Sequence, residues 1–297
     1  MSDAQDRRPE HFFTVDVEEY FQVSAFEAHV ERESWERLPS RVERNVDALL
    51  ELLARYHARG TFFTVGWVAK RHPWMVRRIV AAGHEIASHS FWHRRVNALA
   101  PAEFRDDVRQ AREVIEDISG QRVYGFRAPS FSIRTGMDWV FDILLEEGHR
   151  YDSSTFPIRR PGYGNPGAPI TPYLIRRPGG DLLELPLATT SLLGMRLPAA
   201  GGAYLRQLPL ALVRRGLREH ERQRRGAMFY VHPWEIDPEQ PRIDVGLITA
   251  VRHYRGLDRT LPRLERLLSE FRFTSVAAHF GLLGADHWDP SKAALPA

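Results

Sequence analysis

The stretch Phe12–Glu18 reads Phe-Phe-Thr-Val-Asp-Val-Glu, so it begins with apolar and β-branched residues and ends with two carboxylates. A short run of this kind, rich in aromatic and β-branched residues, is typical of a buried β-strand. On a regular strand, side chains two positions apart share one face, so we expect Asp16 and Glu18 to point the same way. The stretch therefore predicts a core strand that carries a pair of acids at its carboxyl end.

Strand-like segments of this kind alternate with helical patterns along the chain. Further strands are predicted at Thr61–Val65, Glu85–Ser88, Val123–Arg127, Met228–His232 and Phe273–Val276. Helices are predicted at Arg41–His57, Pro73–Ala82, Pro101–Ile118, Met137–Glu147 and Leu257–Phe271. Repeated strand–helix units predict an α/β fold in which helices wrap parallel strands. A chain of 297 residues suits a single barrel-like domain of this class.

The predicted strand ends carry most of the polar residues that could do chemistry. Asp16, His89, Arg127 and His232 fall at or just after a predicted strand end. In parallel α/β folds, reactive residues gather at the carboxyl ends of the strands. This shared placement predicts one common site.

A Pro- and Gly-rich stretch from residue 156 to 204 interrupts the alternation. It is too long for a simple connection, so we interpret it as a loop-rich insertion over the site mouth, with one strand possible at Asp181–Pro186. The alternative is a surface excursion without a functional role. The predicted plan is a single domain: a polar tail at 1–10, a barrel at 11–285 with this insertion, and a C-terminal tail at 286–297.

The composition excludes several classes of protein. The 43% of hydrophobic residues is enough for a sizeable core, and no apolar run approaches the roughly 20 residues that cross a bilayer. The absence of cysteine excludes disulfides, a thiol nucleophile and a thiolate metal site. The N-terminal residues are polar, which predicts no signal peptide and a cytoplasmic location.

The charge pattern argues against a nucleic-acid partner. Lys and Arg number 41 and Asp and Glu 38, a formal charge of +3, and the two signs are interspersed. The densest basic cluster, Arg214–Arg225, has no interleaved aromatic residues that could stack on bases. We therefore expect no nucleic acid, although the cluster could contact an anionic glycan, a lipid surface or phosphate.

His89 and His93 stand four residues apart, directly after a predicted strand. Two imidazoles one helical turn apart can bind one cation, and the acids of Phe12–Glu18 offer a third ligand. The pattern is typical of a hydrolytic metal site. Zinc, cobalt, nickel and manganese would all accept these ligands. The alternative is that they are ordinary buried or surface histidines, since the chain has 13.

Amide hydrolysis also needs a base, an acid for the leaving amine and an oxyanion stabiliser. Asp16 could be the base, with Arg127 holding it ionised. His232 could protonate the departing nitrogen, and Asp152 could fix the tautomer of that imidazole. Each residue also has a structural alternative as a turn residue, a cap or an ion-pair partner.

Five blocks, taken in order, resemble one known family. They are Thr14–Glu19, His89–His93, Arg127–Pro129, Asp152 and His232. Together they resemble the polysaccharide deacetylases of carbohydrate esterase family 4, the NodB-homology group. The resemblance runs from about residue 12 to residue 235. It implies a distorted (β/α) TIM-like barrel, a divalent metal that is commonly zinc, and removal of acetyl groups from N-acetylated sugars.

The resemblance also implies roles for the individual residues. Asp16 would be the base with Arg127 as its partner, and His89 and His93 would bind the metal together with Glu18. The family usually has an Asp as the third ligand, one residue earlier than Glu18. A glutamate is a competent zinc ligand, and a local bulge could restore its reach.

On the acid side, the resemblance makes His232 the general acid and Asp152 its partner. The backbone N–H near Phe131 would help to hold the oxyanion, and Trp234 would line the substrate site. The blocks at residues 16–21, 127–132 and 232–238 further resemble cytoplasmic deacetylases found beside exosortase loci. That branch implies a role in exopolysaccharide biosynthesis.

Two other functions stay open at this point. Some relatives with a glutamate near position 18 resemble metal-free amidohydrolases of cyclic amides, which would require Glu18 to turn away from His89 and His93. A catalytically silent glycan-binding barrel would lack the base or the acid, and both Asp16 and His232 are present. The sugar, its linkage and the oligomeric state do not follow from the sequence.

Overall fold

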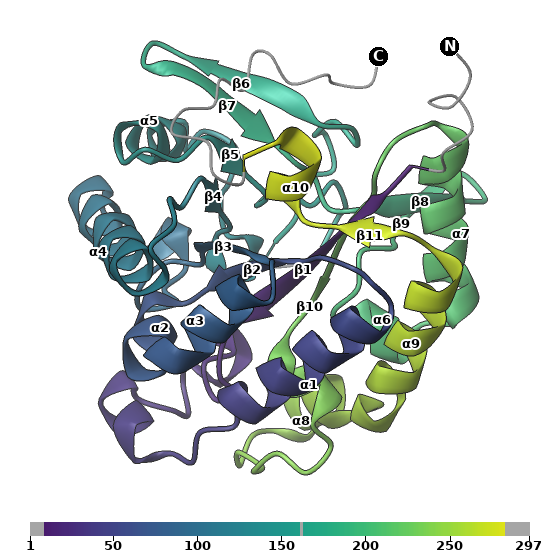
Figure 1. Cartoon of the computed structure of the whole chain (residues 1–297), viewed down its shortest axis with the longest axis horizontal. Helices are drawn as coiled ribbons and strands as arrows, with labels where there is room; N and C mark the ends of the chain where they lie inside the picture. The colour runs from purple at the N-terminus through teal and green to yellow at the C-terminus, as the bar shows by residue number, and fades with distance from the viewer. Residues whose placement is uncertain (1–8, 161–162, 283–297) are drawn as a thin grey trace.

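The computed structural model describes residues 9–160 and 163–282, which form a sheet with helices around it (Figure 1). The strand order is β10-β1-β2-β3-β4-β5-β7-β6, and β11 also pairs with β1. Within this sheet, every ladder is parallel except that between β6 and β7. The strands are β1 His11–Val17, β2 Thr61–Thr64, β3 Glu85–Ser88, β4 Gly125–Phe126, β5 Tyr151–Asp152, β6 Tyr173–Arg177, β7 Gly180–Glu184, β10 Met228–Val231 and β11 Phe273–Thr274.

The two ends of the parallel sheet meet through single bridges. Leu187, just beyond β7, forms a parallel bridge with Met228 of β10, and Gly201 forms another with Tyr230. The N–H of Tyr230 donates to the carbonyl of Ala200 at 2.6 Å. The predicted α/β fold with a parallel sheet is confirmed. The barrel closes only through these isolated bridges and has no regular ladder at this point. In this sense the barrel is distorted.

Ten α-helices lie in the described ranges. They are α1 Val42–Arg55, α2 Gly66–Arg71, α3 Pro73–Ala81, α4 Pro101–Ser119, α5 Trp139–Glu146, α6 Ala203–Gln207, α7 Leu210–Arg222, α8 Leu247–Tyr254, α9 Thr260–Glu270 and α10 Val276–Phe280. In α4, which matches the predicted helix Pro101–Ile118, Phe104, Val108, Ala111 and Ile115 form a buried apolar stripe, as the helical period requires. Within the described ranges, none of these helices combines the length and the apolar character of a membrane span.

Helix α10 covers the amino ends of the strands. The carboxylate of Glu85, at the start of β3, accepts hydrogen bonds from Thr61 Oγ1 at 2.6 Å and Tyr151 Oη at 2.8 Å. It also accepts one from the N–H of Ala277 in α10 at 2.7 Å. These contacts fill the amino end of the barrel, and so the opposite, carboxyl end is where a site can open.

The predicted insertion at 156–204 is only partly correct. Its strand β7 is a member of the main sheet, pairing in parallel with β5, so this part is core rather than an addition. Two short strands, β8 Thr189–Leu192 and β9 Met195–Pro198, form a separate hairpin. The Pro and Gly content hid these strands because it also marks the tight turns between them. Of the predicted tails, residues 1–8 and 286–297 lie outside the described residues.

A substitution at Gly201, which bridges to Tyr230, can test how much the closure of the barrel stabilises the protein. An added Cβ would lie 2.0 Å from the carbonyl oxygen of Tyr230, and the backbone φ is +112°. We expect Gly201→Ala to lower the free energy of unfolding in urea by about 3 kcal/mol, because the clash and the unfavourable φ add. The matched control is Gly179→Ala, which meets nothing within 4 Å. It should stay within about 0.5 kcal/mol of the parent chain. Equal losses in both variants would contradict this account.

Candidate metal centre and active site

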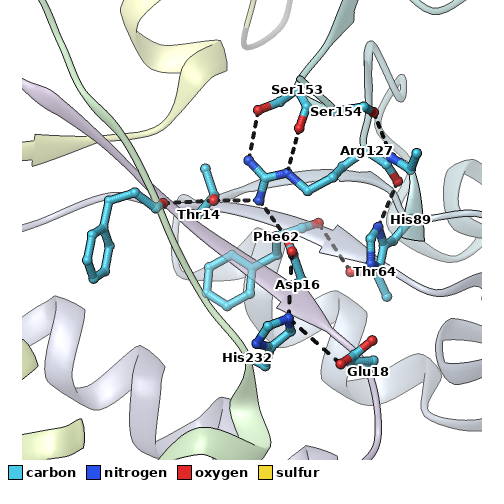
Figure 2. Close-up of polar contacts among 12 residues, drawn as sticks. Thr14, Asp16, Glu18, Phe62, Thr64, His89, Arg127, Ser153, Ser154 and His232 are labelled. Carbon is cyan, nitrogen blue, oxygen red and sulfur yellow. Dashed lines mark hydrogen bonds and ion pairs between the residues drawn. The ribbon is translucent and has the colours of Figure 1, made fainter. Parts of the chain in front are cut away.

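A cavity of about 390 Å³ opens at the carboxyl end of the parallel strands. Its walls come from the ends of β1 and β10, the loop after β3, the turn after β4, and α8. The predicted site residues that line it are Asp16, Glu18, His89, His93, Phe131, His232 and Trp234. Figure 2 shows part of this group, with His232 facing Asp16 and Glu18. The strand-end argument from the sequence therefore located the cavity.

Three buried side chains in the cavity can hold one metal ion. Glu18, His89 and His93 each offer a ligand atom, and these atoms lie within 4.8 Å of one another. Nε2 of His93 is 2.5 Å from Oε2 of Glu18. Nδ1 of His89 donates to the carbonyl of Arg127 at 2.7 Å, which leaves Nε2 as the ligand nitrogen (Figure 2). A backbone carbonyl on the other ring nitrogen is how metal-binding histidines are usually oriented. The residues therefore fit a divalent metal.

The two histidines lie on an irregular loop rather than on a helical turn, although their imidazoles converge as the spacing predicted. Ser90 and His93 have positive φ angles of 62° and 51°. The carboxylate of Asp107 in α4 accepts the N–H groups of Phe91 at 2.8 Å and Trp92 at 3.1 Å. Asp107 therefore holds the loop through these two hydrogen bonds. The two imidazoles converge because the positive φ angles reverse the direction of the backbone between them.

The protonation states of the ligands suit a cation. Burial lowers the pKa of His89 to about 4, so the imidazole is neutral near pH 7. Burial alone would raise the pKa of Glu18, but the nearby His93 and His232 outweigh it and hold this pKa well below its ordinary value. A neutral imidazole and an ionised carboxylate are the forms that bind metal.

Asp16 is held by a fully buried guanidinium. Arg127 donates from Nη1 to Oδ1 of Asp16 at 2.6 Å and to Oγ1 of Thr14 at 2.7 Å (Figure 2). Its Nε donates to the carbonyl of Ser153 at 3.0 Å, and its charge lies 4.1 Å from the ring centre of Phe63. The predicted pairing of Asp16 and Arg127 is present. These hydrogen bonds hold the carboxylate of Asp16 in one orientation at the end of β1.

Both ring nitrogens of His232 face carboxylates. Nε2 lies 3.9 Å from Oδ2 of Asp16 and 3.8 Å from Oε1 of Glu18. Nδ1 lies 3.0 Å from Oε2 of Glu235. Burial would lower the pKa of His232, but Glu18 and Glu235 outweigh it and raise the pKa to about 9. In this environment the imidazole carries a proton at neutral pH.

The sequence reasoning missed Glu235 and its own partner, Arg206 of α6. Nε of Arg206 donates to Oε1 of Glu235 at 2.7 Å, and both side chains are buried. Burial raises the pKa of Glu235, but Arg206 and His232 outweigh it and bring the pKa down to about 2. One signal was available: Glu235 follows His232 by three residues, the spacing at which a carboxylate reaches back to a helix start. Its carboxylate does accept the N–H of His232 at 3.0 Å.

The prediction that Asp152 orients His232 is wrong. Asp152, on β5, accepts from Oγ of Ser154 at 2.5 Å and lies against Glu184. Burial, followed by the Asp152 charge, raises the pKa of Glu184 well above its ordinary value, so the two buried acids hold a proton between them. Because Glu235 already occupies Nδ1 of His232, no ring nitrogen is left for Asp152.

Two other site predictions change in detail. The N–H of Phe131 itself donates to the carbonyl of Ala128 at 3.0 Å, so an oxyanion donor near Phe131 would have to be a neighbouring N–H and stays a prediction. The Phe131 ring still lines the cavity, packed edge-on against Tyr230 at 5.2 Å. Trp234 donates from Nε1 to Oε1 of Glu18 at 2.9 Å, so it positions a metal ligand as well as forming a wall.

Comparisons with known proteins match the two halves of the chain separately. Residues 34–140 match the sequence profile described as "Polysaccharide deacetylase", and residues 153–281 match one described as "Domain of unknown function (DUF3473)". The peptidoglycan deacetylase of Helicobacter pylori is 31% identical over 114 residues, which are 38% of this chain and 37% of that protein. The chitooligosaccharide deacetylase of Bradyrhizobium sp. is 30% identical over 96 residues, which are 32% of this chain and 42% of that protein.

A third relative is the peptidoglycan-N-acetylglucosamine deacetylase of Bacillus cereus, 27% identical over 139 residues. That alignment covers 46% of this chain and 63% of that protein, so the matches span about a third to two thirds of these curated relatives.

Among solved structures, a Mycobacterium smegmatis protein that carries the name polysaccharide deacetylase matches with a TM-score of 0.63. The identity is 20%, and the match covers 93% of this chain and 89% of that one, so this likeness concerns the fold. The profile match contains the loop of His89 and His93 together with Arg127. From these findings, residues 34–140 match the polysaccharide deacetylase family, in line with the resemblance to carbohydrate esterase family 4, the NodB-homology group, and the likeness in fold extends over most of the chain.

Proposed function

We propose that this protein is a metal-dependent hydrolase that removes acetyl groups from N-acetylated sugars of a poly- or oligosaccharide, with zinc as the metal. The observation that carries the proposal is the buried convergence of Glu18, His89 and His93. This group lies beside the carboxylate of Asp16 and the protonated imidazole of His232. The relatives named as peptidoglycan and chitooligosaccharide deacetylases support the substrate class. A role in exopolysaccharide biosynthesis stays a prediction from the sequence.

Asp16 is the proposed base. A divalent metal bound by the three ligands would polarise the acetyl carbonyl and make water more acidic. Asp16 takes the proton of the attacking water, because its Oδ2 is directed to the cavity while Oδ1 is fixed by Arg127. Arg127 keeps this carboxylate oriented between turnovers.

His232 is the proposed acid. Its Nε2 faces the base and the metal ligands, so its proton lies where the amine nitrogen departs. Glu235 accepts from Nδ1 and thereby fixes which way the ring points. Donating a proton to the leaving nitrogen completes cleavage of the C–N bond and releases acetate.

The structure disfavours the two rival functions for specific reasons. A metal-free amidohydrolase would need Glu18 turned away from the histidines, and it lies 2.5 Å from His93. A silent glycan-binding barrel would lack the base or the acid. Asp16 and His232 instead lie 3.9 Å apart in the same cavity.

The metal requirement can be tested with one histidine exchange. We expect His89→Ala to lose both bound metal, measured by elemental analysis, and acetate release from N-acetylated oligosaccharides, because only two ligands remain. The exposed His29, which does not line the cavity, gives a matched control: His29→Ala should keep both. Acetate release by a folded, metal-free His89→Ala protein would refute the proposal.

The role of Glu235 can be separated from that of Asp152 by their amide variants. We expect Glu235→Gln to lower kcat on N-acetylated glycans about 100-fold with little change in KM, because the acid loses its orientation. On 4-nitrophenyl acetate, whose leaving group needs no proton, the loss should be much smaller. Asp152→Asn should leave kcat nearly unchanged on both. If Asp152→Asn proved the more damaging change, the original prediction for Asp152 would be restored.

A further inference from the structure

The cavity extends beyond the metal ligands to a second group of residues. Tyr163, Ala203, Thr249 and Arg252 line it together with the proposed base and acid. Arg252 comes from α8, whose inner side is anchored by His253 stacking on Trp234 at 4.3 Å. This end of the cavity has no part in the proposed acid–base chemistry.

Two arginines from different segments lie near the hydrogen-bonded phenols of Tyr163 and Tyr204. Arg252 approaches from α8, and Arg160 lies three residues before Tyr163, with its charge 5.1 Å from the ring centre of Tyr204. Burial, followed by Tyr204, raises the pKa of Tyr163 above its ordinary value, while Arg160 and Arg252 both act in the opposite direction. Both positive charges are therefore close enough to act on the same phenol.

The two phenols add a hydrogen-bond donor. The hydroxyl groups of Tyr163 and Tyr204 are hydrogen-bonded to each other. One hydroxyl donates in that pair, and so the proton of the other is left to donate elsewhere. The half-buried Tyr163 lines the cavity, which places its oxygen within reach of a ligand.

Neither guanidinium is neutralised by the protein. The other two arginines that line the cavity with Arg252 are each paired with a carboxylate: Arg95 with Glu27 at 2.5 Å, and Arg206 with Glu235 at 2.7 Å. Arg160 and Arg252 form no ion pair with any residue of the ranges 9–160 and 163–282. Arg252 and Tyr163 in the cavity lining, with the exposed Arg160 beside Tyr204, therefore leave an excess of positive charge and N–H donors at this end of the cavity.

We propose that Arg160, Arg252 and Tyr163 form a subsite for an oxyanion, a carboxylate or a phosphate, carried by the glycan that is deacetylated. The inference rests on the proposed function and narrows its substrate class to anionic glycans. Guanidinium groups bind carboxylate and phosphate through paired N–H donors, so a charged substituent fits better than a neutral sugar. Because Tyr163 and Arg252 line the catalytic cavity, the anion belongs to the acetylated sugar or a neighbouring one.

The test compares charged and neutral substrates. The anionic probe is a hyaluronan tetrasaccharide, which alternates N-acetylglucosamine and glucuronate, and the neutral probe is triacetylchitotriose. We expect the Arg160→Ala/Arg252→Ala protein to lose about 10- to 100-fold in kcat/KM on the anionic probe, as for a lost charged hydrogen bond. Acetate release from the neutral probe should be nearly unchanged. Arg252→Lys should retain part of the preference. N-Acetylglucosamine 1-phosphate is the phosphate arm and tells the two oxyanions apart.

Arg255 supplies the control. It directly follows α8, is exposed and does not line the cavity. Arg255→Ala should behave as the parent chain on every probe. Equal kcat/KM values of the parent chain on charged and neutral probes, or an equal loss on both in the double variant, would overturn the subsite and leave the proposed function intact.

Direct binding separates failure of the subsite from failure of the proposed function. If no probe releases acetate from metal-loaded protein, calorimetric titration with the same oligosaccharides decides. Tighter binding of the hyaluronan tetrasaccharide than of triacetylchitotriose, lost in the double variant and weakened by salt, supports the subsite while the proposed activity fails. Equal affinities, or no binding of any anionic probe, refute the subsite.

Discussion

The burial of one positive charge, the guanidinium of Arg127, organises the whole site. A charge without access to water is tolerated only when its donors and its charge are matched. The side chain therefore fixes Asp16 on β1 and the backbone at Ser153 after β5. Its own carbonyl accepts Nδ1 of His89 and so sets which imidazole nitrogen faces the metal position. One residue thus couples the proposed base to a metal ligand across three strands.

The site is assembled from both halves of the chain. His89, His93 and Arg127 lie in the stretch that matches the polysaccharide deacetylase profile. Arg206, His232 and Glu235 lie in the stretch that matches the profile described as a domain of unknown function. That second half also supplies β7 and β10, the strands whose neighbouring bridges close the sheet. The less characterised half is therefore part of the barrel and of the proposed catalytic apparatus, and neither half has a complete cavity alone.

The sequence predicted what depends on local pattern and missed what depends on contacts between distant segments. The strands that carry Asp16 and His89 were visible because their apolar runs end in polar residues. Helix α7 was hidden because its arginines looked like a surface cluster, although Val213 and Leu217 face the core and Arg214 pairs with Glu270.

Within the site, the six residues Asp16, Glu18, His89, His93, Arg127 and His232 were found, whereas the partner of His232 was not. The tautomer of the His232 imidazole is fixed by the carboxylate that lies nearest in space, which is that of Glu235. Asp152 instead contacts Ser154 and Glu184. The hydrogen bond between Trp234 and Glu18 joins residues 216 positions apart, which no local pattern reveals.

The pairing of β1 has a consequence for how the chain acquires its structure. β1, at residues 11–17, is hydrogen-bonded to β10 and β11, whose residues lie more than 200 positions later. During synthesis the first strand emerges from the ribosome long before these neighbours exist. Its apolar face and unpaired edge must wait for nearly the entire polypeptide. Such distant pairings slow folding and expose a nascent chain to aggregation, so chaperone assistance would matter most before β10 appears.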